Sequence, residues 1–121
     1  MNRTNIIRYF SYFTGLEDTE DCLFLIDNAI SKTGAELSDP EAEDIAIDCY
    51  AAALACLDFL NIEYAKSEGE QNFAGVFKGE GKFSDCIRHA AALFTNFRHS
   101  CIEKGYIKPL YAIFCQTGGE E

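Results

Sequence analysis

The feature that most constrains this chain is an alanine-rich apolar stretch near its middle, residues 42–66. Within residues 49–57 the hydroxyl of Tyr50 is the only strongly polar side-chain group. Alanine and leucine favour the helical backbone, and a helix that is apolar on nearly all sides has to be surrounded by other elements. We therefore expect one all-α domain over residues 1–121, a four-helix bundle-like arrangement around a central buried helix.

Three amphipathic helices are expected around the central one. Residues 2–14 place apolar side chains three and four positions apart, and Gly15 is suited to end that helix. A second helix is expected from residue 18 or 19, where the side chains favour an N-cap, to about residue 33 or 34. The last is expected over about 84–104, with Ser84 as its N-cap and a glycine after its end.

The central helix is expected to begin between Ser38 and Glu41. One option is a capping box, with Ser38 as the N-cap and Glu41 three positions later. The other uses Asp39 as the N-cap, with Pro40 at the first helical position. Further along, alanines lie within the narrow polar stripe of this helix, so another helix can approach it closely. The sequence leaves open whether that helix comes from this chain or from a neighbouring subunit.

Two segments depart from the helical pattern. Residues 67–82 hold four glycines together with large apolar side chains. They suggest either a flap or hairpin tucked onto the bundle, or an extension that reaches a partner. Residues 106–121 are prone to form a strand from Leu110 to Cys115. This strand-like arm is expected to pair either within the chain or with a neighbouring subunit.

The net charge of −10 is unevenly distributed. Residues 17–48 hold eleven acidic side chains and one basic one, Lys32, whereas residues 82–121 hold four acidic and five basic side chains. An acidic chain is a poor general ligand for nucleic acid, because phosphate contacts need a basic surface. The asymmetry permits the acidic part of one copy to meet the basic part of another. The alternative is a solvated acidic surface that only maintains solubility.

The six cysteines are expected to be free thiols in a reducing compartment. Five of them lie within helical patterns, and no two are spaced as Cys-x-x-Cys, so neither a zinc site nor a redox motif is indicated. The N-terminal residues lack the apolar core and cleavage site of a signal peptide. The longest uninterrupted apolar run has nine residues, which is short for a membrane span. These observations indicate an intracellular protein without a transmembrane segment.

One loop has a partial likeness to a phosphate-binding motif. Residues 79–84 read GEGKFS, whereas the phosphate-binding pattern needs a glycine five positions before its second glycine and a serine or threonine after the lysine. Val76 and Phe83 occupy those two positions. We therefore expect no nucleotide cofactor.

Some acidic and histidine side chains are of types that can move protons or bind metal ions. Asp85 and His89 are four positions apart and could move a proton, although such a pair more often stabilises the first turn of a helix. The acids between residues 41 and 48 could collect a divalent cation, but a solvated helix start is the simpler interpretation. His89 and His99 are ten residues apart and would not share a metal ion on one helix. No cofactor, no metal and no enzymatic activity are expected.

The order of elements resembles the small helical head–tail connector proteins, also called adaptor or DNA-packaging proteins, of tailed phages and prophages. The resemblance spans roughly residues 5–105 and rests on four sequence segments: residues 14–16, 25–30, 51–55 and 73–75. It implies several copies arranged as a ring beneath the portal, with the loop between the long helices touching the channel or neighbouring subunits. The assembly residues that it implies are Phe73, Gly75, Val76 and Phe77.

The main hypothesis is a non-enzymatic structural adaptor that forms a homo-oligomer against portal or tail proteins, in the bacterial cytoplasm or the virion. It would contact neither a membrane nor a specific nucleic-acid sequence. Acids of residues 17–48, among them Asp44 and Asp48, would face basic residues of the next copy: Arg88, Arg98, Lys104 and Lys108. The alternative is a small acidic regulatory module, inhibitor or antitoxin-like, that acts on a basic protein. A third hypothesis is an enzyme or metal protein that uses Asp85 and His89.

Overall fold

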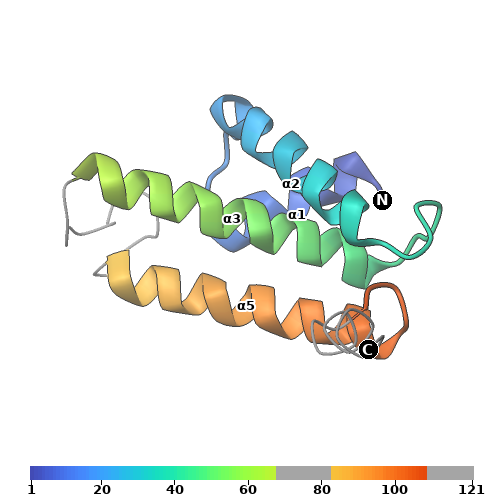
Figure 1. Ribbon diagram of the computed structural model, residues 1–121. Helices are drawn as coiled ribbons and strands as arrows, with labels where there is room; N and C mark the ends of the chain where they lie inside the picture. The colour runs from blue at the N-terminus through green and yellow to red at the C-terminus, as the bar shows by residue number, and fades with distance from the viewer. Residues whose placement is uncertain (68–82, 109–121) are drawn as a thin grey trace, which may run out of the picture.

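The computed structural model describes residues 1–67 and 83–108, and these residues fold as an all-α bundle (Figure 1). The elements in chain order are the helices α1 (Arg3–Thr14), the single-turn 3-10 helix η1 (Glu20–Cys22), α2 (Leu23–Glu36), α3 (Ile45–Ser67) and α5 (Phe83–Glu103). The expected all-α class is confirmed. The expected flap and most of the C-terminal arm lie outside the described residues.

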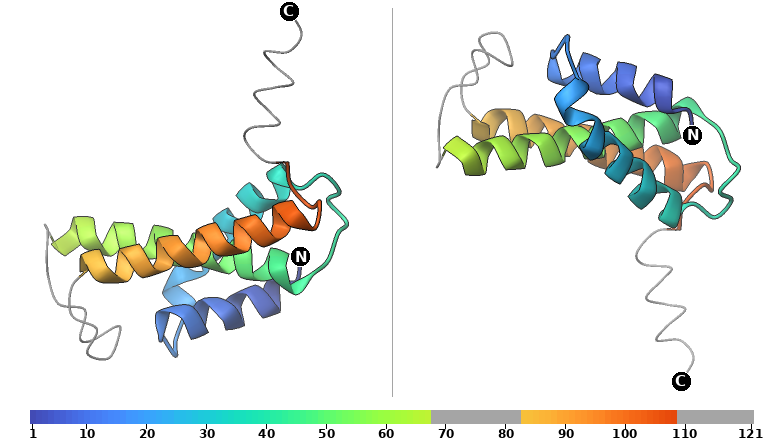
Figure 2. Two further views of the ribbon diagram at one scale, coloured as in Figure 1. Left: turned by 90° about the horizontal axis from the view of Figure 1, so that it is seen from below. Right: turned by 90° about the horizontal axis from the view of Figure 1, so that it is seen from above.

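Helix α3 is the central element, as the alanine-rich stretch predicts. Helix α5 runs antiparallel beside it, α2 crosses it on the side away from α5, and α1 lies alongside (Figures 1 and 2). The side chains of Ala51, Ala52, Ala53 and Ala55 are all fully buried. The alanines in the polar stripe of α3 are therefore covered by helices of the chain itself. This settles the question of which chain supplies the approaching helices.

The apolar side chains form two neighbouring clusters. The larger joins α1, α2, α3 and the first turns of α5, and includes the fully buried Ile6, Phe10 and Ile26. The smaller joins the end of α2 to α3 and α5, and its buried members are Leu37, Ala46, Ile47, Tyr50, Cys101 and Ile107. An isolated antiparallel bridge between Leu37 and Ile107 closes this second cluster. The chain after α5 thus returns to the connector that follows α2.

Helix α3 starts later than expected, at Ile45 rather than near residues 38–41. The Asp44 carboxylate accepts a hydrogen bond from the Ala46 backbone N–H at 2.7 Å, which is the contact of an N-cap. Asp39 instead accepts from the Glu41 backbone N–H at 3.0 Å and closes a local turn. Several carboxylates in this segment could act as the N-cap of α3. Asp44 takes this position, and its carboxylate also contacts Lys104 and Tyr106.

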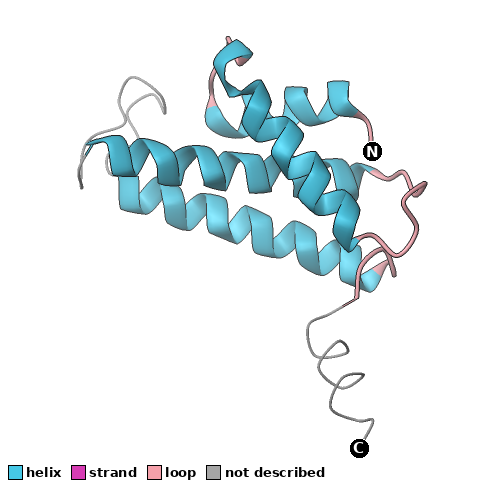
Figure 3. Ribbon diagram, turned by 45° about the horizontal axis from the view of Figure 1, so that its top comes forward, coloured by secondary structure: helices cyan, strands magenta, loops and turns pink. Residues whose placement is uncertain are grey.

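Several other helix ends agree with expectation more closely, although Ser84, expected as the N-cap of the last helix, lies inside α5, which begins at Phe83. Asn2 caps α1 by accepting from the Asn5 N–H, and Gly15 ends it with φ 79°. Gly105 follows α5 with φ 81°, a left-handed conformation that suits glycine. Helix α2 differs, because the single turn η1 precedes it and the α-helix proper begins at Leu23. Figure 3 shows the loops at both ends of α2.

By length and composition, α3 also meets the criteria for a membrane-crossing helix. The most apolar 18-residue window within residues 45–66 has a mean hydropathy of 1.7, and among the described helices this is the one that qualifies. The longest uninterrupted apolar run does not indicate this, because Asp48 and Asp58 lie at either side of residues 49–57. In the bundle 67% of the most apolar window is buried inside the protein. A buried core helix passes the same test, so this finding is weak support for a membrane span.

Candidate functional site

A first polar cluster joins three helices at the end of the bundle where α2 finishes. The Tyr50 hydroxyl donates a hydrogen bond to Glu36, and the Arg98 guanidinium donates to Glu36 at 2.9 Å and to the Tyr50 oxygen at 2.6 Å. The Tyr50 ring stacks on Phe94, with ring centroids 5.1 Å apart. Burial and the Glu36 carboxylate raise the pKa of Tyr50, which therefore stays protonated. We call these three residues the tyrosine junction.

A second polar cluster connects Asn2 and the segment that follows α5 to the start of α3. Tyr106 donates a hydrogen bond to the Asp44 carboxylate at 2.7 Å, and the Lys104 ammonium lies 3.4 Å from the same group. The Asn2 backbone N–H donates to Asp48 at 3.0 Å, and Asp48 is buried, with 5% of its surface exposed. Both acids thus stabilise the fold of their own chain.

The contacts of Asp44 predict how stability depends on pH. The Tyr106 hydroxyl, the Ala46 N–H and Lys104 hold the pKa of Asp44 below its ordinary value of 3.8. A carboxylate with a lowered pKa stabilises the fold above its unfolded-state pKa, and this contribution disappears as the pH falls through the folded-state value. We expect Asp44→Asn to lower Tm at neutral pH, and the difference from the wild type to shrink below about pH 4. Thermal scans across this range measure it, and a difference that grows in acid would contradict it.

These clusters change the role of several residues expected to mediate assembly. Arg98 and Lys104 contact acids of residues 17–48, as the charge pattern suggests, but within one chain. Arg88 pairs with Asp85 at 3.1 Å on an exposed part of α5, and Lys108 is exposed. Arg88 and Lys108 therefore remain accessible to a partner. Arg98 does not serve as a clean probe of assembly, because reversing its charge would disturb the tyrosine junction.

The candidate chemical sites are not drawn together. The described residues contain no group of three or more His, Cys, Asp or Glu side chains that could hold a metal ion. His89 is exposed, and His99 pairs with Glu103 at 3.2 Å on the surface of α5. Of the loop likened to a phosphate-binding motif, only Phe83 and Ser84 are among the described residues, and both belong to α5.

Five cysteines are buried: Cys22, Cys49, Cys56, Cys86 and Cys101. Of these, Cys22, Cys49, Cys56 and Cys101 are free thiols, as expected. Burial raises the pKa of Cys49 to about 11 and that of Cys56 to about 12. These thiols are therefore poor nucleophiles near neutral pH, because the thiolate is the reactive form. Cys115, the sixth, lies outside the described residues. The five act as small apolar side chains of the core.

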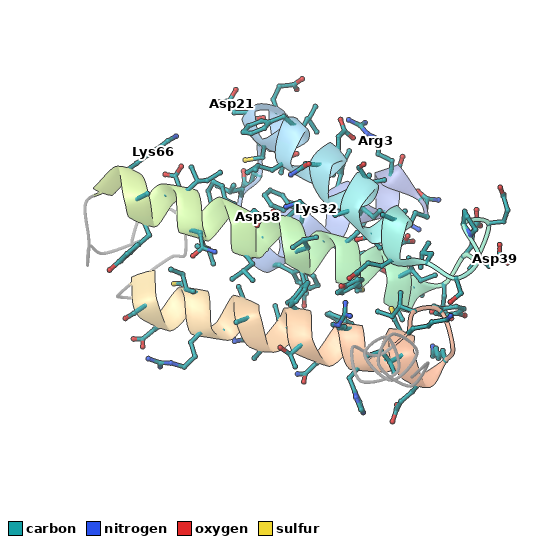
Figure 4. The ribbon with its side chains drawn as sticks, in the orientation of Figure 1. Arg3, Asp21, Lys32, Asp39, Asp58 and Lys66 are labelled. Carbon is teal, nitrogen blue, oxygen red and sulfur yellow. The ribbon has the colours of Figure 1, made fainter. Side chains whose placement is uncertain are left out.

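A hollow of about 300 Å³ lies between the start of α2 and the last turns of α3. Its lining comes from the loop after α1, from η1, from the first turn of α2 and from the C-terminal half of α3: Leu16, Asp18, Asp21, Cys22, Phe24, Leu25, Phe59, Ile62, Glu63 and Lys66. Figure 4 shows Asp21 and Lys66 rising from two different elements on the same side of the bundle. We call this surface the acidic hollow.

The acidic hollow combines apolar and charged groups. Its buried lining includes Cys22, Leu25 and Phe59, whereas Phe24 is 65% exposed and Ile62 is 37% exposed. Lys66 pairs with Glu63 at 3.4 Å. Asp18, Asp21 and their neighbours Glu17 and Glu20 are exposed, and none of them belongs to an ion pair within the described part of the chain. An apolar surface beside unpaired carboxylates is suited to a partner that is both apolar and cationic.

Sequence reasoning did not single out this surface. Phe24 lies within the expected second helix, and 65% of its surface is exposed. The available signal was the position of Phe24, outside the three-and-four spacing of Cys22, Leu25 and Ile26 and three positions after the last of the four acids in residues 17–21. Comparisons with protein-family models, curated proteins and solved structures found no match to this chain.

Proposed function

We propose that this chain is a non-enzymatic adaptor protein of the phage or prophage head–tail connector type. In this proposal several copies assemble with one another against a portal, and the chain binds other proteins rather than transforming a small molecule. The observation that supports the protein-binding part of this proposal best is the acidic hollow, whose lining includes the exposed Phe24. Exposed apolar groups next to a hollow are typical of protein-binding surfaces.

The charged contacts between copies are assigned to groups that the chain leaves accessible. Arg88 and Lys108 are exposed, and in the proposal they face acids of a neighbouring subunit. Arg98 and Lys104 are not assigned to these contacts, because they already form ion pairs with Glu36 and Asp44. Phe73, Gly75, Val76 and Phe77 remain proposed assembly residues from the resemblance, and they lie outside the described residues. Unlike surfaces on one subunit generate rings when the rotation between copies closes.

Assembly is tested by measuring the mass of the protein in solution. We expect light scattering and native mass spectrometry to find a defined oligomer whose population falls as salt is raised, since exposed charge contacts are screened. Arg88→Glu should weaken assembly, whereas Arg8→Glu, which makes the same charge change on α1, should not. Thermal unfolding of both variants would establish that the monomer fold is intact.

A chain that stays monomeric at every concentration and salt would contradict the homo-oligomeric part of the proposal. It would favour a second function, a small acidic binding or regulatory module that acts on a basic protein. The observation that favours this alternative is the run of exposed carboxylates at residues 17–21, which have no ion pair within the described part of the chain. The two functions differ in self-assembly and share the acidic hollow.

A further inference from the structure

We propose that the acidic hollow binds a cationic amphipathic segment of a partner protein. A large apolar side chain of that segment enters the hollow, and its lysine or arginine side chains lie against Asp18 and Asp21. This inference rests on the protein-binding part of the proposed function, since it names the partner chemistry of the same surface. It holds equally for an adaptor and for a monomeric regulatory module.

The size and lining of the hollow favour an apolar anchor. A volume of about 300 Å³ is at the lower end of small-molecule sites, which suits a large side chain better than a cofactor. The floor holds Leu25 and Phe59, which are almost fully buried, while Phe24 and Ile62 extend the apolar surface outward. An amphipathic segment would cover these exposed side chains as it docks. Helical ligands commonly insert anchors of this kind into grooves between helices.

The acidic residues at the rim of the hollow determine which charge a partner needs. Glu63 is paired with Lys66, but Asp18 and Asp21 are not paired with any cation in the described part of the chain. A second copy of this chain is a poor occupant of the hollow itself. Its exposed cations Arg88 and Lys108 are already assigned to the contacts between subunits, and the rest of its charge, −10 in total, is repelled by the acidic rim of the hollow. A cationic segment is attracted to this rim. Its side chains pair with Asp21 and with Asp18, which also accepts a hydrogen bond from the Glu20 backbone N–H at 3.0 Å. This is why we commit to a basic partner.

Model peptides of known composition test the inference on the full chain. The probe is a fluorescently labelled 14-residue amphipathic helix made only of leucine and lysine. One comparison peptide replaces each lysine with glutamate, and another replaces each leucine with serine and so keeps the charge. Anisotropy at physiological salt should show that the leucine–lysine peptide binds most tightly. The other two peptides should bind at least about tenfold more weakly, since both apolar burial and charge are needed.

Matched variants locate the binding site. Phe24→Ser and Asp21→Lys should each weaken binding of the leucine–lysine peptide by about tenfold or more. Tyr12→Ser removes an aromatic ring that is even more exposed, 83%, and Glu41→Lys reverses an acid in the loop that holds Asp39, at the other end of the molecule (Figure 4). Both controls should bind as the wild type does. Ile62→Ser provides a second apolar variant should Phe24→Ser fold poorly.

Three results would overturn the inference. Equal binding of the leucine–lysine and serine–lysine peptides would show charge attraction without an apolar anchor. Equal losses in the hollow variants and the controls would place the peptide elsewhere. Loss of self-assembly in Phe24→Ser, without any peptide binding to the wild type, would show that a second copy occupies the hollow.

The inference and the proposed function fail separately. If the peptide does not bind while the protein still forms its oligomer, the inference fails and the adaptor function stands. If the peptide binds to a chain that never oligomerises, the homo-oligomeric function fails and the inference stands.

Discussion

Replacing Tyr50 with alanine is expected to lower the free energy of unfolding by about 3–5 kcal/mol, the range for truncating a fully buried aromatic side chain. Tyr50 is 2% exposed and stacks on Phe94, so its removal leaves a cavity between α3 and α5. It also takes the ring from beneath the Arg98 guanidinium, which lies 5.9 Å from the ring centroid. A typical domain is stable by about 5–15 kcal/mol, so this single change removes a large share of the total.

Tyr50→Phe is the matched control for that measurement, because it removes the hydroxyl and keeps the ring. Arg98 retains its ion pair with Glu36 at 2.9 Å, so neither charge is left without a partner. We expect a loss of about 1 kcal/mol, the net value of a typical hydrogen bond. Urea or guanidinium unfolding of both variants measures the two losses. A loss in Tyr50→Phe as large as in Tyr50→Ala would mean that the polar contacts, rather than packing, stabilise this junction.

Phe10→Ala is expected to destabilise the protein by about 3–5 kcal/mol, for the same reason at a different interface. The Phe10 side chain is fully buried and meets Phe59 of α3 edge to face, with ring centroids 6.0 Å apart. Its loss opens a cavity where α1 packs on α3. Because α1 also supplies the Asn2 contact to Asp48, loosening this helix should weaken that hydrogen bond as well.

Tyr12→Ala is the matched control, two positions along the same helix. Tyr12 is 83% exposed, so the change should alter stability by no more than about 0.5 kcal/mol. The pair is measured by chemical unfolding followed by circular dichroism. Similar losses in both variants would contradict the packing of α1 that the bundle shows, since only Phe10 faces the core.

Much of the helical architecture could be predicted from the sequence because it depends on local periodicity. The alanine-rich stretch predicts a helix surrounded by others, and its alanines are indeed buried. Gly15 and Gly105 mark helix ends because they adopt positive φ there, a conformation that is unfavourable for other residues. Such signals act over a few residues, so a single chain displays them without reference to its tertiary structure.

The start of α3 could not be predicted in the same way. Ser38, Asp39 and Asp44 are all good N-cap residues, and local rules do not rank them decisively. Asp44 is favoured because Tyr106 and Lys104, about sixty residues later, contact the same carboxylate. An N-cap that depends on residues distant in sequence can be identified only once the fold has brought those residues together.

The charge pattern also left undetermined which opposite charges meet in the fold. The sequence contains an acidic first half and a weakly basic last third, and it predicts that the two attract each other. It does not reveal that Glu36 meets Arg98 and Asp44 meets Lys104 within one chain. Coulomb attraction depends on distance, and the order of residues leaves the distance between remote charges undetermined.

The sequence by itself therefore determined the all-α class, the buried central helix and the positions of most helix ends. Only the tertiary structure decided which acids form ion pairs within the chain and which remain exposed beside the acidic hollow. The physical reason is that helix formation follows from neighbours along the chain, whereas a binding surface is whatever apolar area and charge remain after the helices have packed. Phe24 illustrates the difference, because its helix was predicted and its exposure was not.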